Sequence, residues 1–231
     1  MRIFILTLIL TGISSISHAI VLKETTQLIS QRKFSPPTPS YDQLLQNIGK
    51  DRKSLKSNNM SLDSCRQYFL YQFEHEIFPH WVGTTWDYNG YTNRPGEGKL
   101  IACGYFVSTP LKHMGFNWNR FKLAQMYSKA IVDTLCNDMT SYTDLELMIE
   151  DLKTRKNHLY IVGLDNHVGM LLKSNGNMWF VHSNYIGIEG PVKEYALESE
   201  ALSYSSNYWL GTFTSDENMQ KWLDGTEFPT E

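Results

Sequence analysis

The chain has 231 residues, of which 42% are hydrophobic and 19% charged, and its formal net charge is −3. This length and composition support one packed domain with extensions, and they exclude disordered and collagen-like chains. The positive charges form no block, so we expect no nucleic-acid partner and no binding to an anionic membrane surface.

The first residues are typical of an export signal. An apolar run over residues 3–10 is too short to cross a bilayer comfortably, and small and polar residues follow it. Ser17 and Ala19 occupy the two positions that a signal peptidase reads, which predicts cleavage after Ala19. We therefore expect an exported protein, periplasmic or extracellular, with no membrane contact once residues 1–19 are removed. An uncleaved anchor is the alternative.

Residues 20–60 form a polar extension that contains the proline-rich run 35–40. Prolines favour an extended backbone, so this region is expected to be a spacer with a short helix over 41–55. The composition changes at Ser61, and we expect one domain over residues 61–226.

The hydrophobic periodicity of this domain changes from helical in its first half to strand-like in its second half. Helices are expected from Ser61 to Pro79, from Cys103 towards Gly115, over 121–135 and over 144–153. Strands are expected at 158–164, 167–172, 178–183 and 208–213, with a hairpin turn at 174–177. Helices followed by antiparallel strands predict an α+β domain with its helices packed on one face of the sheet.

Cys103 is the first candidate for chemistry, because it follows a glycine-rich loop and begins an expected helix. A helix N-terminus carries partial positive charge and stabilises a thiolate, which is the reactive form of cysteine. Gly104 leaves the thiol uncrowded and allows a substrate backbone to come close. The alternative is that Cys103 is a small buried hydrophobic residue.

Two histidines on neighbouring strands are candidates for the base and its orienting partner. His167 begins an apolar strand, where it could reach a thiol on a facing element. His182 lies on the returning strand and could hold the other imidazole nitrogen of His167, which fixes its tautomer. Asn184, on the same face two residues later, is the competing candidate. A surface histidine beside a turn and a polar edge-strand residue are the alternatives.

The other cysteines and histidines give weaker signals. Export implies an oxidising compartment, and three cysteines leave one free thiol if one disulfide forms. If Cys103 is the free one, Cys65 and Cys136 are a candidate pair, although the sequence does not fix the pairing. No histidine spacing typical of zinc and no phosphate-binding glycine motif occurs, so we expect no metal and no cofactor.

An ordered set of motifs follows along the domain: Gly83–Gly90, Pro95-Gly96, Ile101–Val107, Met114–Phe116 with Asn119-Arg120, His167–Met170 and Phe180–Ser183. Taken together, these motifs resemble the core of the NlpC-type cell-wall cysteine peptidases. The resemblance covers roughly residues 80–215 and implies a papain-like fold and hydrolysis of an amide in peptidoglycan stem peptides. Cys103, His167 and His182 match the positions of the family's nucleophile, base and third polar residue.

The resemblance also gives Trp86 a role and shows where the chain departs from the family. Trp86 stands at the position of an active-site aromatic, usually Tyr, that helps at the oxyanion, where an indole N–H could also donate. The family usually has Asp and Ser on either side of the cysteine, and these polar groups help to hold the substrate. Here those residues are Ala102 and Gly104.

Three hypotheses follow for the function. The leading one is an exported cysteine hydrolase that cleaves an amide in peptidoglycan or a peptide through a thioacyl-enzyme. The second keeps Cys103 and His167 but acts on another substrate, as a transpeptidase or an acyl-group hydrolase. The third is a catalytically inactive wall-binding module whose binding surface is the aromatic-rich loop over residues 81–91.

Overall fold

The computed structural model describes residues 39–187 and 189–230, so the expected signal peptide lies outside the described residues. One compact unit begins at Ser40 and includes helix α2 (Tyr41–Ser57). The expected domain boundary at Ser61 is therefore too late. Helix α2 belongs to this unit because Ile48 is buried in the shared core and the Arg52 guanidinium donates to the Trp222 carbonyl, 3.2 Å away.

The second half of the unit forms a six-stranded sheet, which confirms the α+β class. Its strands are β1 (Thr140–Tyr142), β2 (Leu159–Leu164), β3 (Val168–Ser174), β4 (Asn177–Asn184), β5 (Gly190–Tyr195) and β6 (Tyr208–Thr212). Their spatial order is β1-β6-β2-β3-β4-β5, and every neighbouring pair is antiparallel. The four expected strands are confirmed, whereas β1 and β5 were not predicted.

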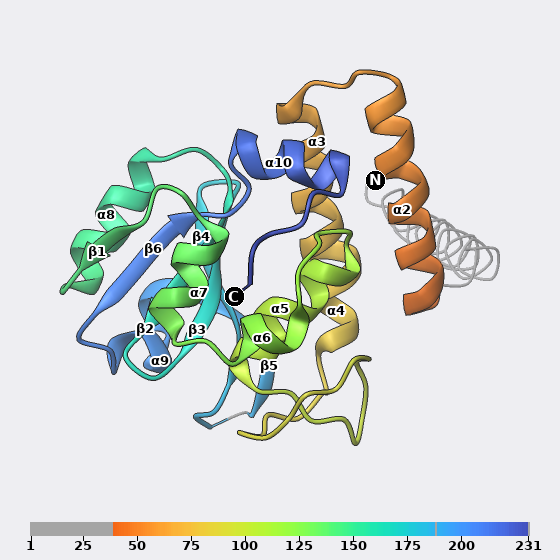
Figure 1. Ribbon diagram of the computed structural model, residues 1–231. Helices are drawn as coiled ribbons and strands as arrows, with labels where there is room; N and C mark the ends of the chain where they lie inside the picture. The colour runs from red at the N-terminus through yellow and green to blue at the C-terminus, as the bar shows by residue number, and fades with distance from the viewer. Residues whose placement is uncertain (1–38, 188, 231) are drawn as a thin grey trace, which may run out of the picture. The chain divides into compact units, whose positions relative to one another are not determined.

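Both faces of the sheet are covered, so the expectation of helices on one face is wrong. Helices α5 (Cys103–His113) and α7 (Ser128–Leu135) contact the strands on the first face (Figure 1). Helices α8 (Leu145–Thr154) and α9 (Glu200–Ser203) contribute to a second core with the opposite face. Adjacent residues of β2 accordingly point into different cores, and both sides of this strand are apolar.

The hairpin between β3 and β4 has the turn that the sequence predicts. Asn175 and Gly176 both have positive φ angles, 51° and 79°, as a tight two-residue hairpin turn requires. Ser174 faces Asn177 across this turn, and Met170 faces Val181 further along the pair. The turn therefore fixes which β4 residues lie beside the start of β3.

The first helical segment continues beyond its expected end at Pro79. Helix α3 (Leu62–Tyr71) is followed by a π-helical turn (Gln72–Ile77) and by α4 (Phe78–Trp81). Proline has no N–H to donate and crowds the preceding turn of an α-helix. The turn before Pro79 is a wider π-turn, in which the Phe78 N–H donates to the Phe73 carbonyl. This wider turn allows the helical path to continue.

The single helix expected over 121–135 is divided into α6 (Arg120–Ala124) and α7. The division allows α7 to pack on β2, where the Ser128 hydroxyl donates to the Leu164 carbonyl at 2.5 Å. Gly163 lies so close to Ser128 that an added Cβ would be 2.8 Å from the Ser128 carbonyl carbon. Helical periodicity alone could not predict this break, because packing on the sheet determines it.

One more helix, α10 (Asp216–Asp224), was not predicted, and it packs against α3 and α2. Ser215 caps its N-terminus, and Gly225 ends it in the left-handed conformation. The buried Phe228 follows it in the core, so the compact unit also extends beyond the expected end at residue 226. Within residues 39–187 and 189–230, no helix is both long and apolar enough to cross a bilayer.

The candidate disulfide between Cys65 and Cys136 is not formed. Both residues are free and buried. The Cys65 sulfur lies in α3, 3.9 Å from the Met60 carbonyl oxygen, whereas Cys136 packs against Gly211 of β6. Each thiol therefore fills its own place in the core, which is the common behaviour of a structural free cysteine.

Candidate active site

A cavity of about 910 Å³ opens between the glycine-rich loop, helices α5 to α7 and the strand ends that carry the candidate base. Cys103 and His167 both line it. Aromatic side chains make up much of the wall, namely Trp86, Tyr88, Tyr91, Tyr105, Phe121, Tyr127 and Tyr185. The structure thus brings the two residues that the sequence analysis assigns to nucleophile and base into one cavity.

Cys103 is held at the first position of α5, and it is partly exposed. Ala102 precedes the helix and gives no side-chain cap to its N-terminus. Backbone contacts position this segment, because the Ala102 N–H donates to the Gly90 carbonyl at 2.8 Å. From the sheet, the Ser183 hydroxyl donates to the Ile101 carbonyl, also at 2.8 Å. The thiol is therefore fixed from the loop on one side and from β4 on the other.

The thiol is less acidic than its place at a helix N-terminus suggests. Burial raises the pKa of Cys103 above its ordinary value, and backbone N–H groups of Val168, Gly104 and Cys103 itself act in the opposite direction. Burial has the larger effect, because it removes water that would solvate the thiolate. The expected stabilising N–H groups are thus present, but Cys103 is a protonated thiol at neutral pH. The contact with Val168 also puts the sulfur beside the residue that follows His167.

His167 and His182 are in direct contact, although the strand register puts His182 opposite Gly169, two residues from His167 on the same face. The Nε2 atom of His167 lies 2.8 Å from Nδ1 of His182, and both side chains are buried. Asn184, the competing third residue, is engaged elsewhere: its side chain donates to the Ile186 carbonyl and accepts from the Ile186 N–H, at 2.6 and 3.1 Å. The geometry therefore favours His182 over Asn184 as the partner of His167.

A third side chain, Glu194, extends this chain of hydrogen bonds and was missed by the sequence analysis. Its Oε1 atom lies 3.1 Å from Nε2 of His182. Burial alone would raise the pKa of Glu194, but hydrogen bonds from His182 and Ser199 outweigh burial and lower it. Glu194 is therefore an ionised acceptor at neutral pH. It lies on β5, and no alternating pattern in the sequence marks this polar edge strand.

The protonation of the three side chains determines which nitrogen atoms carry hydrogen. Burial lowers the pKa of His167, and the neighbouring His182 ring lowers it further, because the two imidazoles cannot readily be protonated together. Burial also lowers the pKa of His182, against the opposing effect of Glu194. Both rings are thus neutral. Because the Glu194 carboxylate only accepts, His182 must donate from Nε2 and accept at Nδ1. His167 then donates from Nε2, and its Nδ1 atom is left with a free lone pair.

Trp86 and Gly104, the two residues assigned to substrate or oxyanion contacts, also line the cavity. The Trp86 ring lies 6.0 Å from that of Tyr185, which in turn lies 5.1 Å from the His167 ring. Tyr185 is a further residue that the sequence analysis missed. Gly104 has a packing role, because an added Cβ would be 2.3 Å from the Ala124 carbonyl oxygen. Only glycine permits this approach of α5 to α6.

No family model, curated protein or solved structure matches the chain. The resemblance to the NlpC-type peptidases accordingly depends on the motifs themselves. Within the part of the chain that the structure describes, no group of three or more His, Cys, Asp or Glu side chains is placed to bind a metal ion.

Proposed function

We propose that the protein is a cysteine hydrolase that cleaves an amide bond through a thioacyl-enzyme, with Cys103 as nucleophile and His167 as base. One observation carries the proposal: the hydrogen-bond chain Glu194–His182–His167 ends in the cavity that Cys103 lines. A wall-binding module has no need of a buried chain that leaves one imidazole nitrogen unprotonated. General-base activation of a thiol requires that arrangement.

In the proposed reaction, Nδ1 of His167 takes the Cys103 proton while the sulfur attacks the amide carbonyl carbon. The ionised Glu194, acting through His182, stabilises the imidazolium that forms. His167 then gives this proton to the leaving amine, and a thioester remains. Water, activated by the same imidazole, attacks the thioester and releases the carboxylic acid. Because the pKa of the thiol is raised and that of His167 is lowered, the thiolate forms during the attack.

The oxyanion of the tetrahedral intermediate needs donors beside the attacking sulfur. Helix α5 has no side-chain cap, and the backbone N–H groups of Cys103 and Gly104 already lie near the thiol. We assign the Cys103 N–H to the oxyanion, with the indole N–H of Trp86 as the second donor. The positive end of α5 would add to this stabilisation.

The proposed substrate is the stem peptide of peptidoglycan, and the proposed fold family is papain-like. A cysteine at the start of a helix that packs on an antiparallel sheet bearing the histidine supports both proposals, together with the ordered motifs. Export after removal of residues 1–19 would bring the enzyme to this substrate. Ala102 and Gly104 replace polar residues of the family, so the bond that is cleaved needs its own determination.

The direct test is digestion of purified sacculi with the chain from Ile20 onward and with its Cys103→Ala variant, followed by mass analysis of the fragments. We expect release by the first and none by the second, and the fragment masses identify the bond. Equal release from both proteins would reject Cys103 as the nucleophile. Binding of both proteins to sacculi without release would favour the wall-binding module.

A further inference from the structure

We propose that the cavity beside Cys103 binds an uncharged, largely apolar side chain next to the scissile bond and rejects carboxylates and ammonium groups. This inference rests on the proposed hydrolase function for the position of the scissile bond. It goes further, because neither the motifs nor the Cys103–His167 pair determines which substrate group occupies the cavity.

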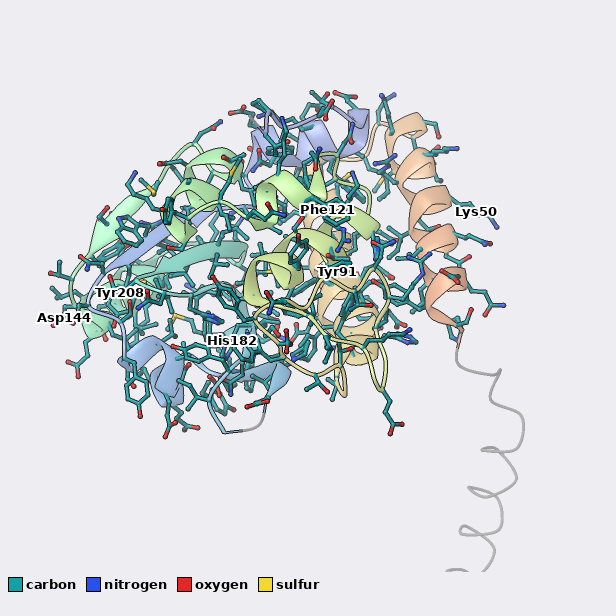
Figure 2. All side chains as sticks on the ribbon, turned by 60° about the horizontal axis from the view of Figure 1, so that its bottom comes forward. Lys50, Tyr91, Phe121, Asp144, His182 and Tyr208 are labelled. Carbon is teal, nitrogen blue, oxygen red and sulfur yellow. The ribbon has the colours of Figure 1, made fainter. Side chains whose placement is uncertain are left out.

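The cavity wall is aromatic and in large part open to a ligand. Four of its rings belong to strongly exposed side chains: Tyr88, Tyr91, Phe121 and Tyr127 are 81%, 62%, 50% and 90% exposed. Tyr91 and Phe121 flank the Tyr105 ring, with centroid separations of 6.3 and 6.0 Å, and Figure 2 shows both in one region of the molecule. An apolar side chain that covers these rings would remove apolar surface from water, which favours binding.

Fixed charge is scarce among the residues that line the cavity. None of them is Lys or Arg, and Asp165 is their one acidic residue. The Asp165 carboxylate already accepts from the Ser206 N–H at 2.7 Å, from the Asn207 amide at 2.8 Å and from the Ser205 hydroxyl at 3.3 Å. The cavity thus offers a carboxylate ligand no cation to pair with, and Asp165 would repel it.

Arg120 lies behind this wall but is engaged with protein atoms. Its guanidinium carbon lies 4.4 Å from the Phe121 ring centre and 5.2 Å from that of Tyr105. Its N–H groups donate to the carbonyls of Tyr91 and Thr92 and to the Thr109 hydroxyl, at 3.0 to 3.2 Å. A second cation placed on the same rings would be repelled by Arg120, so an ammonium group is disfavoured as well.

The energetic consequence follows from desolvation. A carboxylate that enters the cavity loses water and gains no partner of opposite charge, and an ammonium group meets only Asp165, whose carboxylate already accepts three hydrogen bonds. An amide or an alkyl group of the same shape loses little. Charge, and not size, should therefore separate good from poor substrates. A stem peptide with an amidated carboxyl group would fit this cavity better than one with a free carboxylate.

The test uses four peptide amides that differ only in the residue on the acyl side of a fluorogenic leaving amine: glutamine, glutamate, leucine and lysine. Glutamine and glutamate are nearly isosteric, so their comparison isolates charge. We expect kcat/KM at pH 7 to be about tenfold or more lower for glutamate and lysine than for glutamine and leucine. Equal values, or a preference for glutamate or lysine, would overturn the inference.

A variant that introduces a positive charge sharpens this test. Gln125 is exposed, lines the cavity and donates to the Tyr105 hydroxyl at 3.1 Å. Gln125→Lys supplies the missing cation and should shift the ratio of glutamate to glutamine kcat/KM towards glutamate by about tenfold. Gln220→Lys, on the exposed face of α10 and outside the cavity, is the matched control and should leave the ratio unchanged. An unchanged ratio in a folded Gln125→Lys protein would count against the inference.

Binding separates this inference from the proposed function. The same four peptides are titrated into the Cys103→Ala variant by calorimetry, which needs no turnover. We expect the glutamine and leucine peptides to bind about tenfold or more tightly than the other two. If this order holds but the parent protein hydrolyses no peptide and releases no sacculus fragment, the hydrolase proposal fails and the cavity preference stands. If the affinities are equal, or no peptide binds, the cavity preference is wrong.

Discussion

The candidate site has a helical wall, which carries Cys103 at the start of α5, and a sheet wall, which carries His167 and His182. The two walls are built in different ways. On the helical wall, Cys103 is positioned through backbone atoms of its neighbours: the Ala102 N–H donates to the Gly90 carbonyl, and the Ile101 carbonyl accepts from the Ser183 hydroxyl of β4. On the sheet wall, side chains hold one another, because His167, His182 and Glu194 form one hydrogen-bonded chain. A backbone-held position tolerates changes of its neighbours, whereas a side-chain relay depends on each of its members.

The largest effect is expected on the helical wall, at the one side chain that it contributes to the reaction. Cys103→Ala should lower kcat by about 10³-fold or more, because it removes the proposed nucleophile. The variant should melt within a few degrees of the parent, since backbone contacts hold this segment. Peptide hydrolysis and a thermal melt check both parts. A large loss of stability would show that the thiol also holds the helical wall together.

The next largest effect is expected on the sheet wall. His182→Ala should lower kcat by about 10²-fold, because His167 loses the acceptor that fixes its tautomer. Asn184→Ala is the matched comparison and should leave kcat within about threefold, because Asn184 bonds only to Ile186 in a local turn. Steady-state kinetics of the two variants decide whether His182 or Asn184 is the partner of His167. A larger loss in Asn184→Ala would reverse the assignment of the third residue.

A smaller effect is expected at the outer end of the relay. Glu194→Gln should lower kcat by about tenfold, because an amide can donate to His182 and no longer selects its tautomer. Glu198→Gln, at an exposed position, is the control. NMR of the His182 ring nitrogens reports which nitrogen carries the proton. A purely structural role of Glu194 would leave this tautomer unchanged in Glu194→Gln. An unchanged Nε2–H tautomer with full activity would remove Glu194 from the relay.

The smallest effect concerns the protonation of the thiol, where the two walls meet. Burial raises the pKa of Cys103, so its thiolate fraction at pH 7 is lower than that of an ordinary thiol with a pKa of about 8.5. Alkylation by iodoacetamide should therefore rise nearly tenfold between pH 7 and pH 8 and keep rising beyond pH 8.5. The Cys103→Ala protein gives the background. A rate that is already constant at pH 7 would indicate a preformed thiolate.

Local signals predict much of this arrangement. The helical start at Cys103 and the Asn175-Gly176 turn predict that His182 and Asn184 lie near His167, and the side-chain contacts of the structure then favour His182. The same signals identify the α+β class, because helical and strand periodicities are separated along the chain.

The parts that were missed depend on contacts distant in sequence. Glu194 lies on an edge strand without alternation, and Tyr185 reaches His167 only through the course of the chain after β4. The division of the helix at 121–135 follows from the packing of Ser128 on β2. The raised pKa of Cys103 depends on burial, which the helix N-terminus alone does not reveal.

The tight turn at Asn175-Gly176 has a consequence for how the hairpin can vary in length. Successive strand residues point to opposite faces, so one inserted residue that shifts the register would turn His182 away from His167. The turn is exposed and does not line the cavity, and substitutions there need only tolerate positive φ angles. Exchanges among Asn, Asp and Gly should thus be tolerated at this turn, whereas single-residue insertions and deletions should be selected against.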